Sequence, residues 1–113
     1  MAATYVSNIT VNSGEDFGQT FTLESTDSSS ALNLTGYSVS SQMRKHAGSS
    51  TKTDFTAEAL TPLTDGKIKI SLTNTQTSAL KAGRYVYDVV IEIEGIKTRV
   101  LEGMVLVRQG VTR

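Results

Sequence analysis

The chain has no cysteine and no tryptophan, one proline and one histidine among its 113 residues. The lack of cysteine excludes disulfides and thiol chemistry. A metal site usually needs several converging ligands, and His46 in a polar Lys-His-Ala-Gly segment does not supply them. No run of about 18 apolar residues is present, so we expect no membrane-spanning helix. The N-terminus lacks the charged and apolar regions of a signal peptide.

Signatures of catalysis and of nucleic-acid binding are equally sparse. A Ser-His-Asp triad would have to use His46, and no Gly-x-Ser-x-Gly turn surrounds any serine. Glu92 and Glu94 share one face of a predicted strand, but we expect both to face solvent. The 11 basic and 11 acidic residues balance, without the basic stripe that nucleic acid favours. We therefore predict a non-enzyme that uses no cofactor or metal and binds neither nucleic acid nor membranes.

The chain does have a repeated two-residue alternation of apolar and polar side chains, which is typical of half-buried strands. It is clearest at 67–72, where Ile68, Ile70 and Leu72 face one side. In residues 17–23, Gln19 is the one polar exception on an otherwise apolar face. The remaining predicted strands are 5–11 at an edge, 37–44, 55–60, 85–94 and 96–107.

Polar residues, glycines and a cap separate these strands. The segments 24–30 and 46–53 are predicted loops, and Asp65-Gly66 and Glu94-Gly95 are predicted tight turns. Thr73 with Gln76 has the form of a capping box. We expect one helical turn there, which Gly83 ends and which places Leu80 in the core. Gly103, inside the last strand, indicates a bulge or a close backbone approach.

About seven short strands separated by turns predict an all-β, immunoglobulin-like antiparallel β-sandwich with one short helical turn, as a single domain over residues 1–113. Tyr85 is placed to form a tyrosine corner, in which the hydroxyl bonds to the backbone upstream. Tyr87 then takes the place of the second cysteine of antibody domains, and Gly83 fits the turn into the strand. Alternatively, the two tyrosines are only strand aromatics at period two.

Several runs occur in a recognisable order: Leu34-Thr35-Gly36-Tyr37, then 65–72, 77–89 and 101–107, with Val111-Thr112-Arg113 at the end. Together they resemble small structural proteins of tailed bacteriophages, in particular the immunoglobulin-like N-terminal domain of baseplate upper proteins. The resemblance runs from about Asn8 to Arg113 and implies a β-sandwich virion component without catalytic residues. Baseplate upper proteins continue beyond this domain, so the position in the particle stays open. The chain could equally be a tail adaptor, a neck component, a fibre-anchoring collar or a capsid cement protein.

We therefore expect a virion structural protein, assembled in the host cytoplasm in several symmetric copies by contact with other virion proteins. Capsid decoration is one alternative, and a carbohydrate- or host-surface-binding module is another. Sugar binding would need exposed aromatics, and most of the three Phe and four Tyr lie on apolar faces. Termini and long polar loops add little to a core. The expected contacts are therefore the arm 2–7 with Tyr5 and Val6, the loop 46–53 with His46, and the tail 108–113 with Arg108 and Arg113.

Overall fold

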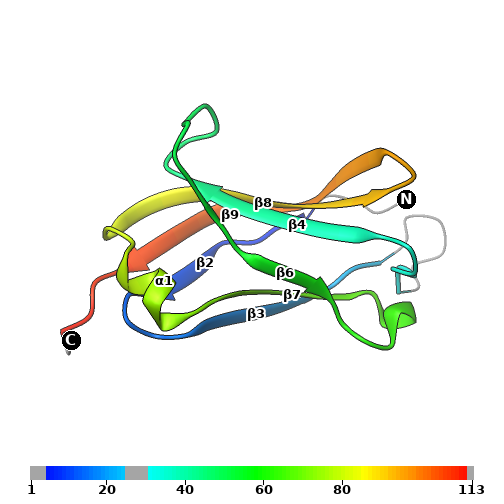
Figure 1. Cartoon of the computed structure of the whole chain (residues 1–113), viewed down its shortest axis with the longest axis horizontal. Coiled ribbons are helices and arrows are strands. Elements are labelled where there is room, and N and C mark those ends of the chain that lie inside the picture. The colour runs from blue at the N-terminus through cyan, green and yellow to red at the C-terminus, as the bar shows by residue number, and fades with distance from the viewer. Residues whose placement is uncertain (1–4, 25–30, 112–113) are drawn as a thin grey trace.

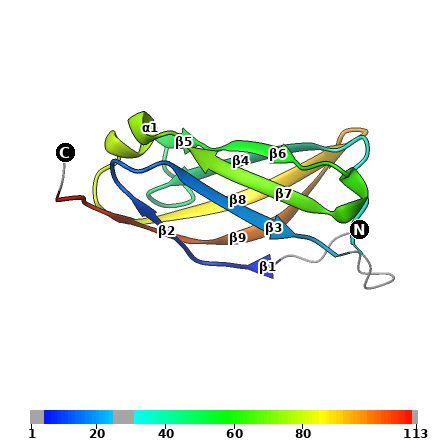
Figure 2. The same ribbon diagram turned by 90° about the horizontal axis from the view of Figure 1, so that it is seen from below.

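The computed structural model describes residues 5–24 and 31–111 and consists of two β-sheets packed face to face (Figures 1 and 2). The large sheet has the order β1-β9-β8-β4-β5, with β2 also paired to β9, and the small sheet has the order β3-β7-β6. The predicted all-β sandwich is confirmed. Its strands are β1 (Tyr5–Val6), β2 (Ile9–Asn12), β3 (Phe17–Thr22), β4 (Ser38–Arg44), β5 (Lys52–Asp54), β6 (Thr56–Ala59), β7 (Lys67–Leu72), β8 (Gly83–Ile93) and β9 (Ile96–Arg108).

The core lies between the sheets and is built by the alternation. From β7, Ile68, Ile70 and Leu72 are buried, and from β8, Val89 and Ile91 face them from the large sheet. Burying an aliphatic side chain of this size stabilises the fold by about 1.5–3 kcal/mol. Because both sheets contribute to one apolar layer, we expect each sheet to depend on the other for its stability.

The hairpin between β8 and β9 was predicted at Glu94-Gly95 and is confirmed. Both residues have positive φ, 52° and 80°, as a two-residue turn matched to the strand twist requires. Further along, Val89 pairs with Leu101 but Val90 pairs with Arg99. Val100 is therefore an extra residue in β9. The bulge allows the consecutive residues Val100 and Leu101 both to be buried.

The N-terminal segment differs from the single edge strand predicted over residues 5–11. It forms two short strands, β1 and β2, and both run parallel to β9, so the sandwich is not antiparallel throughout. Alternation gives the face of a side chain but carries no information on strand direction, which explains the difference.

Two connections also differ from their predictions. The predicted loop 46–53 is shorter, because Lys52 and Thr53 begin β5 and pair with β4. Asp65-Gly66 is not a two-residue hairpin turn. Leu63–Asp65 instead forms a short 3₁₀ helix, η1, which Gly66 ends in the left-handed conformation at φ 67°.

The helical turn was predicted at its start and misplaced at its end. Helix α1 spans Asn74–Ser78, and the reciprocal bonds of Thr73 and Gln76 confirm the capping box. The helix ends at Ala79, so Gly83 does not terminate it. Thr77 is fully buried, whereas Leu80 is half-buried against the core.

Gly83 is instead the first residue of β8, at φ 146°. Two residues on, the hydroxyl of Tyr85 donates to the carbonyl oxygen of Lys81 at 2.8 Å, which is the bond that defines a tyrosine corner. The ammonium group of Lys45 lies 4.8 Å from the centre of the Tyr85 ring. These contacts fasten the connection from α1 to the large sheet.

Candidate interaction surface

A kink at Ser7 and Asn8 joins β1 to β2 and is fastened to the middle of the large sheet. The amide of Ser7 donates to the carbonyl of Glu102 at 2.9 Å, and the amide of Met104 donates to Oδ1 of Asn8 at 3.0 Å. A Cβ on Gly103 would lie 2.1 Å from the carbonyl oxygen of Ser7. Gly103 therefore permits the close backbone approach that holds the N-terminal arm.

The buried side chain of Tyr87 also holds Ser7 of the N-terminal arm in place. Its hydroxyl donates to the carbonyl oxygen of Ser7 at 2.6 Å, and its ring packs edge-on against Phe55 with centroids 6.2 Å apart. Burial raises the pKa of the Tyr87 phenol above its ordinary value, and the side chain of Ser7 offsets only part of that rise. At neutral pH the neutral hydroxyl therefore acts as the donor that holds the arm.

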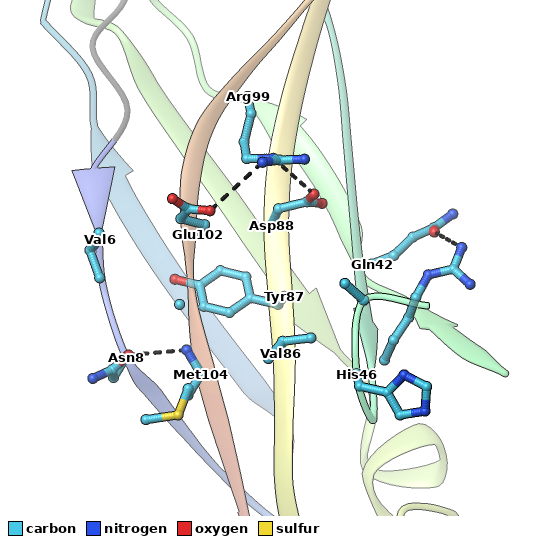
Figure 3. Close-up of a pocket in the computed structure, with 13 residues that line it drawn as sticks. Val6, Asn8, Gln42, His46, Val86, Tyr87, Asp88, Arg99, Glu102 and Met104 are labelled. Atoms are coloured by element: carbon cyan, nitrogen blue, oxygen red, sulfur yellow. Dashed lines mark hydrogen bonds and ion pairs between the residues drawn. The ribbon is translucent and has the colours of Figure 1, made fainter. Parts of the chain in front are cut away.

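The outer face of the large sheet, on the far side of Gly103, carries a groove of about 840 Å³ (Figure 3). Val86 on β8 and Met104 on β9 are directly paired across the strands and are 36% and 47% exposed. Val6, which is 74% exposed, lies at the β1 side of the groove, and His46 lies at the opposite side (Figure 3). We call Val6, Val86 and Met104 the apolar strip.

Charged side chains border the apolar strip. Arg99 lies 3.3 Å from the carboxylate of Asp88 and 3.8 Å from that of Glu102 (Figure 3). On the β4 side, Arg44 donates to the carbonyl of Ser49 at 2.5 Å and to Oε1 of Gln42 at 3.1 Å. The strip is thus an exposed apolar area framed by charges of both signs, an arrangement typical of protein interfaces.

The structure brings two of the predicted contact residues to this groove. Val6 and His46, which are 40 positions apart in the sequence numbering, both line it. Tyr5, next to Val6 in β1, is exposed but is not part of the lining. Arg108 is exposed at the far end of β9, paired in register with Asn12 of β2. Arg113 lies outside the described residues, as do residues 2–4 of the arm.

Sequence reasoning missed Val86 and Met104. Met104 lies in the continuous apolar run 104–107, in which alternation cannot separate the two faces. Val86 stands between two tyrosines and was not assigned a role. The available signal was register: once Tyr87 is placed in the core, Val86 must face outward. Direct pairing with Met104 depends also on the bulge at Val100, because the hairpin register continued without it would place Gly103 opposite Val86.

A second groove of about 700 Å³ lies between the β2–β3 turn, the connection from α1 to β8 and the residues that follow β9. It is lined by Gly14, Leu80 and Lys81 together with Gln109 and Gly110 from the predicted contact tail. Its lining lacks a strip of exposed large apolar side chains like that of the first groove. Within residues 5–24 and 31–111, no group of three or more His, Cys, Asp or Glu side chains is placed to hold a metal ion. None of the described helices is long and apolar enough to cross a bilayer.

No protein-family model matches this sequence, and no curated protein matches it. Among solved structures, a crystal structure of Listeria monocytogenes InlP is similar to this chain, with a TM-score of 0.51 and 14% sequence identity. The alignment covers 93% of this chain and 28% of the InlP chain. At this identity the likeness shows the sandwich fold alone, and a shared fold does not carry a function with it.

Proposed function

We propose that this chain is a structural component of a tailed-bacteriophage virion that assembles by protein–protein contact in the tail, baseplate or neck. Two lines of support meet in this proposal. The sequence runs between Asn8 and Arg113 resemble the immunoglobulin-like domain of baseplate upper proteins. The structure adds a surface suited to docking, which the resemblance does not itself supply.

The apolar strip is the observation that carries the proposal. A sheet face that only meets water is expected to carry polar side chains between the buried ones. Here Val86 and Met104 are exposed next to each other, and Val6 lies at the edge of the same groove. Contiguous exposed apolar side chains with a polar rim mark protein-interaction sites. A neighbouring virion protein would bury this strip and leave the charged border at the rim of the contact.

The groove favours a protein partner over a sugar. Glycans are usually held by exposed aromatic rings, and the aromatic residue of this groove is Tyr87, which is 4% exposed. Its hydroxyl is already bonded to Ser7. Capsid decoration uses the same kind of contact as a tail position, so it remains the second candidate for where in the particle the chain would be assembled.

The test compares a charged substitution on the strip with a matched one elsewhere. Particles of the virus that encodes this chain are purified and the chain is quantified in them by mass spectrometry. We expect Met104→Glu to reduce incorporation strongly, because a buried unpaired carboxylate opposes docking. Thr56→Glu, an exposed position on the outward side of β6, should incorporate like the native chain. Absence of the native chain from purified particles would contradict the proposal, and normal incorporation of Met104→Glu would remove the strip from it.

A further inference from the structure

We infer that the β3 edge of the small sheet pairs with β3 of a second copy of this chain, in an antiparallel arrangement with a two-fold axis at Gln19. The inference goes beyond the proposed function, since self-pairing requires no virion component. It concerns a different sheet from the apolar strip. It would also supply one symmetric contact of the kind the assembly needs.

Within residues 5–24 and 31–111, β3 is a free edge, and its own sequence lacks the usual protection. It pairs with β7 on one side and ends the small sheet on the other. It is six residues long, whereas the other edges, β1, β2, β5 and β6, have two, four, three and four residues. Edges β5 and β6 carry Lys52, Asp54 and Glu58, but no residue from Phe17 to Leu23 is charged. A long, uncharged edge without proline or bulge is a template for pairing with another strand.

The free backbone groups of this edge can be assigned by alternation. The amide of Leu23 donates to Gly66, just beyond the β7 ladder, at 2.8 Å. In an antiparallel ladder the amide and carbonyl of successive residues point to opposite sides. Gly18, Thr20 and Thr22 therefore direct both groups away from β7. In the described part of the chain no side chain or loop bonds to the amides and carbonyls of these three residues.

The side chains of β3 are self-complementary about Gln19. When two copies pair antiparallel with Gln19 facing its equivalent, Phe17 of each copy faces Phe21 of the other. Both phenylalanines are only half-buried in the single chain, and Gln19 between them is exposed. Aromatic cross-strand pairs stabilise a sheet. This register also places Gly18 opposite Thr20, the residues whose outward groups must bond.

The antiparallel pairing about Gln19 explains why this one polar residue lies on the otherwise apolar face of β3. Gln19 shares a side with Phe17 and Phe21, and its side-chain amide has no hydrogen-bond partner among the described residues. At the two-fold axis it occupies a non-hydrogen-bonded pair, in which side chains approach most closely. A glutamine amide carries both a donor and an acceptor. Two such amides related by the axis can therefore bond to each other reciprocally.

The experiment uses the purified full chain and measures its mass by sedimentation equilibrium over a wide concentration range. We expect a monomer–dimer equilibrium. Gln19→Glu and Gln19→Lys should each weaken it roughly tenfold, because each places like charges opposite one another. Mixing these two variants should restore a dimer that contains one of each. Thr56→Glu on the other edge of the same sheet should dimerise like the native chain.

A backbone variant tests the ladder separately from charge. Thr20→Pro removes an amide that points away from β7, so the fold should be retained while the dimer is lost. Circular dichroism checks the fold. A native chain that stays monomeric at every concentration would overturn the inference, as would a Gln19→Glu variant that dimerises normally or a mixture that forms no heterodimer. Each of these results would leave the particle test with Met104→Glu unaffected, because that residue lies on the large sheet.

Discussion

On the small sheet, the outward side chains of β6 and β7 include the charged residues Glu58, Lys67 and Lys69. On the large sheet, the outward side chains of β8 and β9 include the apolar residues Val86 and Met104. Both sheets follow the same alternation and contribute to the same core. They differ in what the alternate residues present to the outside. One face is an ordinary solvated surface, and the other carries an exposed apolar strip with charges around it. We attribute this difference to the docking proposed for the outer face of the large sheet.

The sheets also differ in how their edges are finished. The large sheet carries the fastened arm of β1 and β2, held at Ser7 and Asn8. The small sheet ends at β3, which has no further neighbour among the strands that the structure describes. Face contact is therefore expected on one sheet and edge contact on the other. Substitutions in the core, at Gly103, in the helix cap and at Tyr87 test this comparison between the sheets.

Alanine substitutions in the core test whether the two sheets share one core. Ile70→Ala in β7 and Ile91→Ala in β8 each remove buried methyl groups and leave a cavity. We expect each to lower the free energy of unfolding by about 2–5 kcal/mol. Urea unfolding followed by circular dichroism measures the loss. A large loss for one variant and none for the other would mean that the sheets are stabilised separately.

Gly103→Ala should weaken the attachment of the N-terminal arm to the large sheet. The new Cβ would meet the carbonyl of Ser7, so the arm must move away from β9. We expect a loss of about 1–3 kcal/mol, as is typical of overpacking, with faster amide exchange at Ser7 and Met104. Gly48→Ala is the control, because its Cβ would have no neighbour closer than 3.8 Å. Equal behaviour of the two variants would show that Gly103 is not needed for the close approach.

The helix that connects the two sheets depends on its cap, which we expect to contribute less to stability than the core or Gly103. Helix α1 follows β7 of the small sheet and precedes β8 of the large one. Thr73→Ala removes the side chain that accepts from the amide of Gln76. We expect a loss of about 1 kcal/mol in urea unfolding. Thr75→Ala, at an exposed helix position, should have no such cost, and a comparable loss there would argue against a specific cap.

The smallest effect is expected at high pH and again concerns the large sheet. Burial raises the pKa of Tyr87 above 10.0 in the folded chain. Folding therefore favours the protonated phenol, so its contribution is complete below the unfolded pKa and declines as pH rises through the folded pKa. Tyr87→Phe should lack this part of the decline above about pH 10. Parallel pH profiles of the two proteins would contradict the assignment.

Local patterns predicted much of this fold because their physical causes are local. The alternation at Ile68, Ile70 and Leu72, the cap at Thr73 and the turn at Glu94-Gly95 all depend on residues close in sequence. The parallel pairing of β1 and β2 depends on contacts with β9, almost a hundred residues away, which alternation cannot encode. The burial of Thr77 depends on a similar distant partner, since its hydroxyl bonds to the carbonyl of Glu15.

The candidate surface was predicted less well than the fold. Val6 and His46 were chosen because they lie in an arm and a loop, and the groove unites them. The strip residues Val86 and Met104 lie within strands, where an apolar side chain is ordinarily assigned to the core. Only the register of β8 against β9 shows that these two face outward together. Exposed apolar residues inside strands are therefore the signal that sequence reasoning misses first.

The rate of methionine oxidation tests directly whether the apolar strip is an assembly surface. Met104 is exposed and Met43 is buried in the isolated chain, so hydrogen peroxide should oxidise Met104 before Met43. Peptide mass spectrometry then compares the free chain with the chain inside purified particles. We expect Met104 to be strongly protected in the particle and Met43 to be protected in both. Equal oxidation of Met104 in the free and the assembled chain would contradict the account.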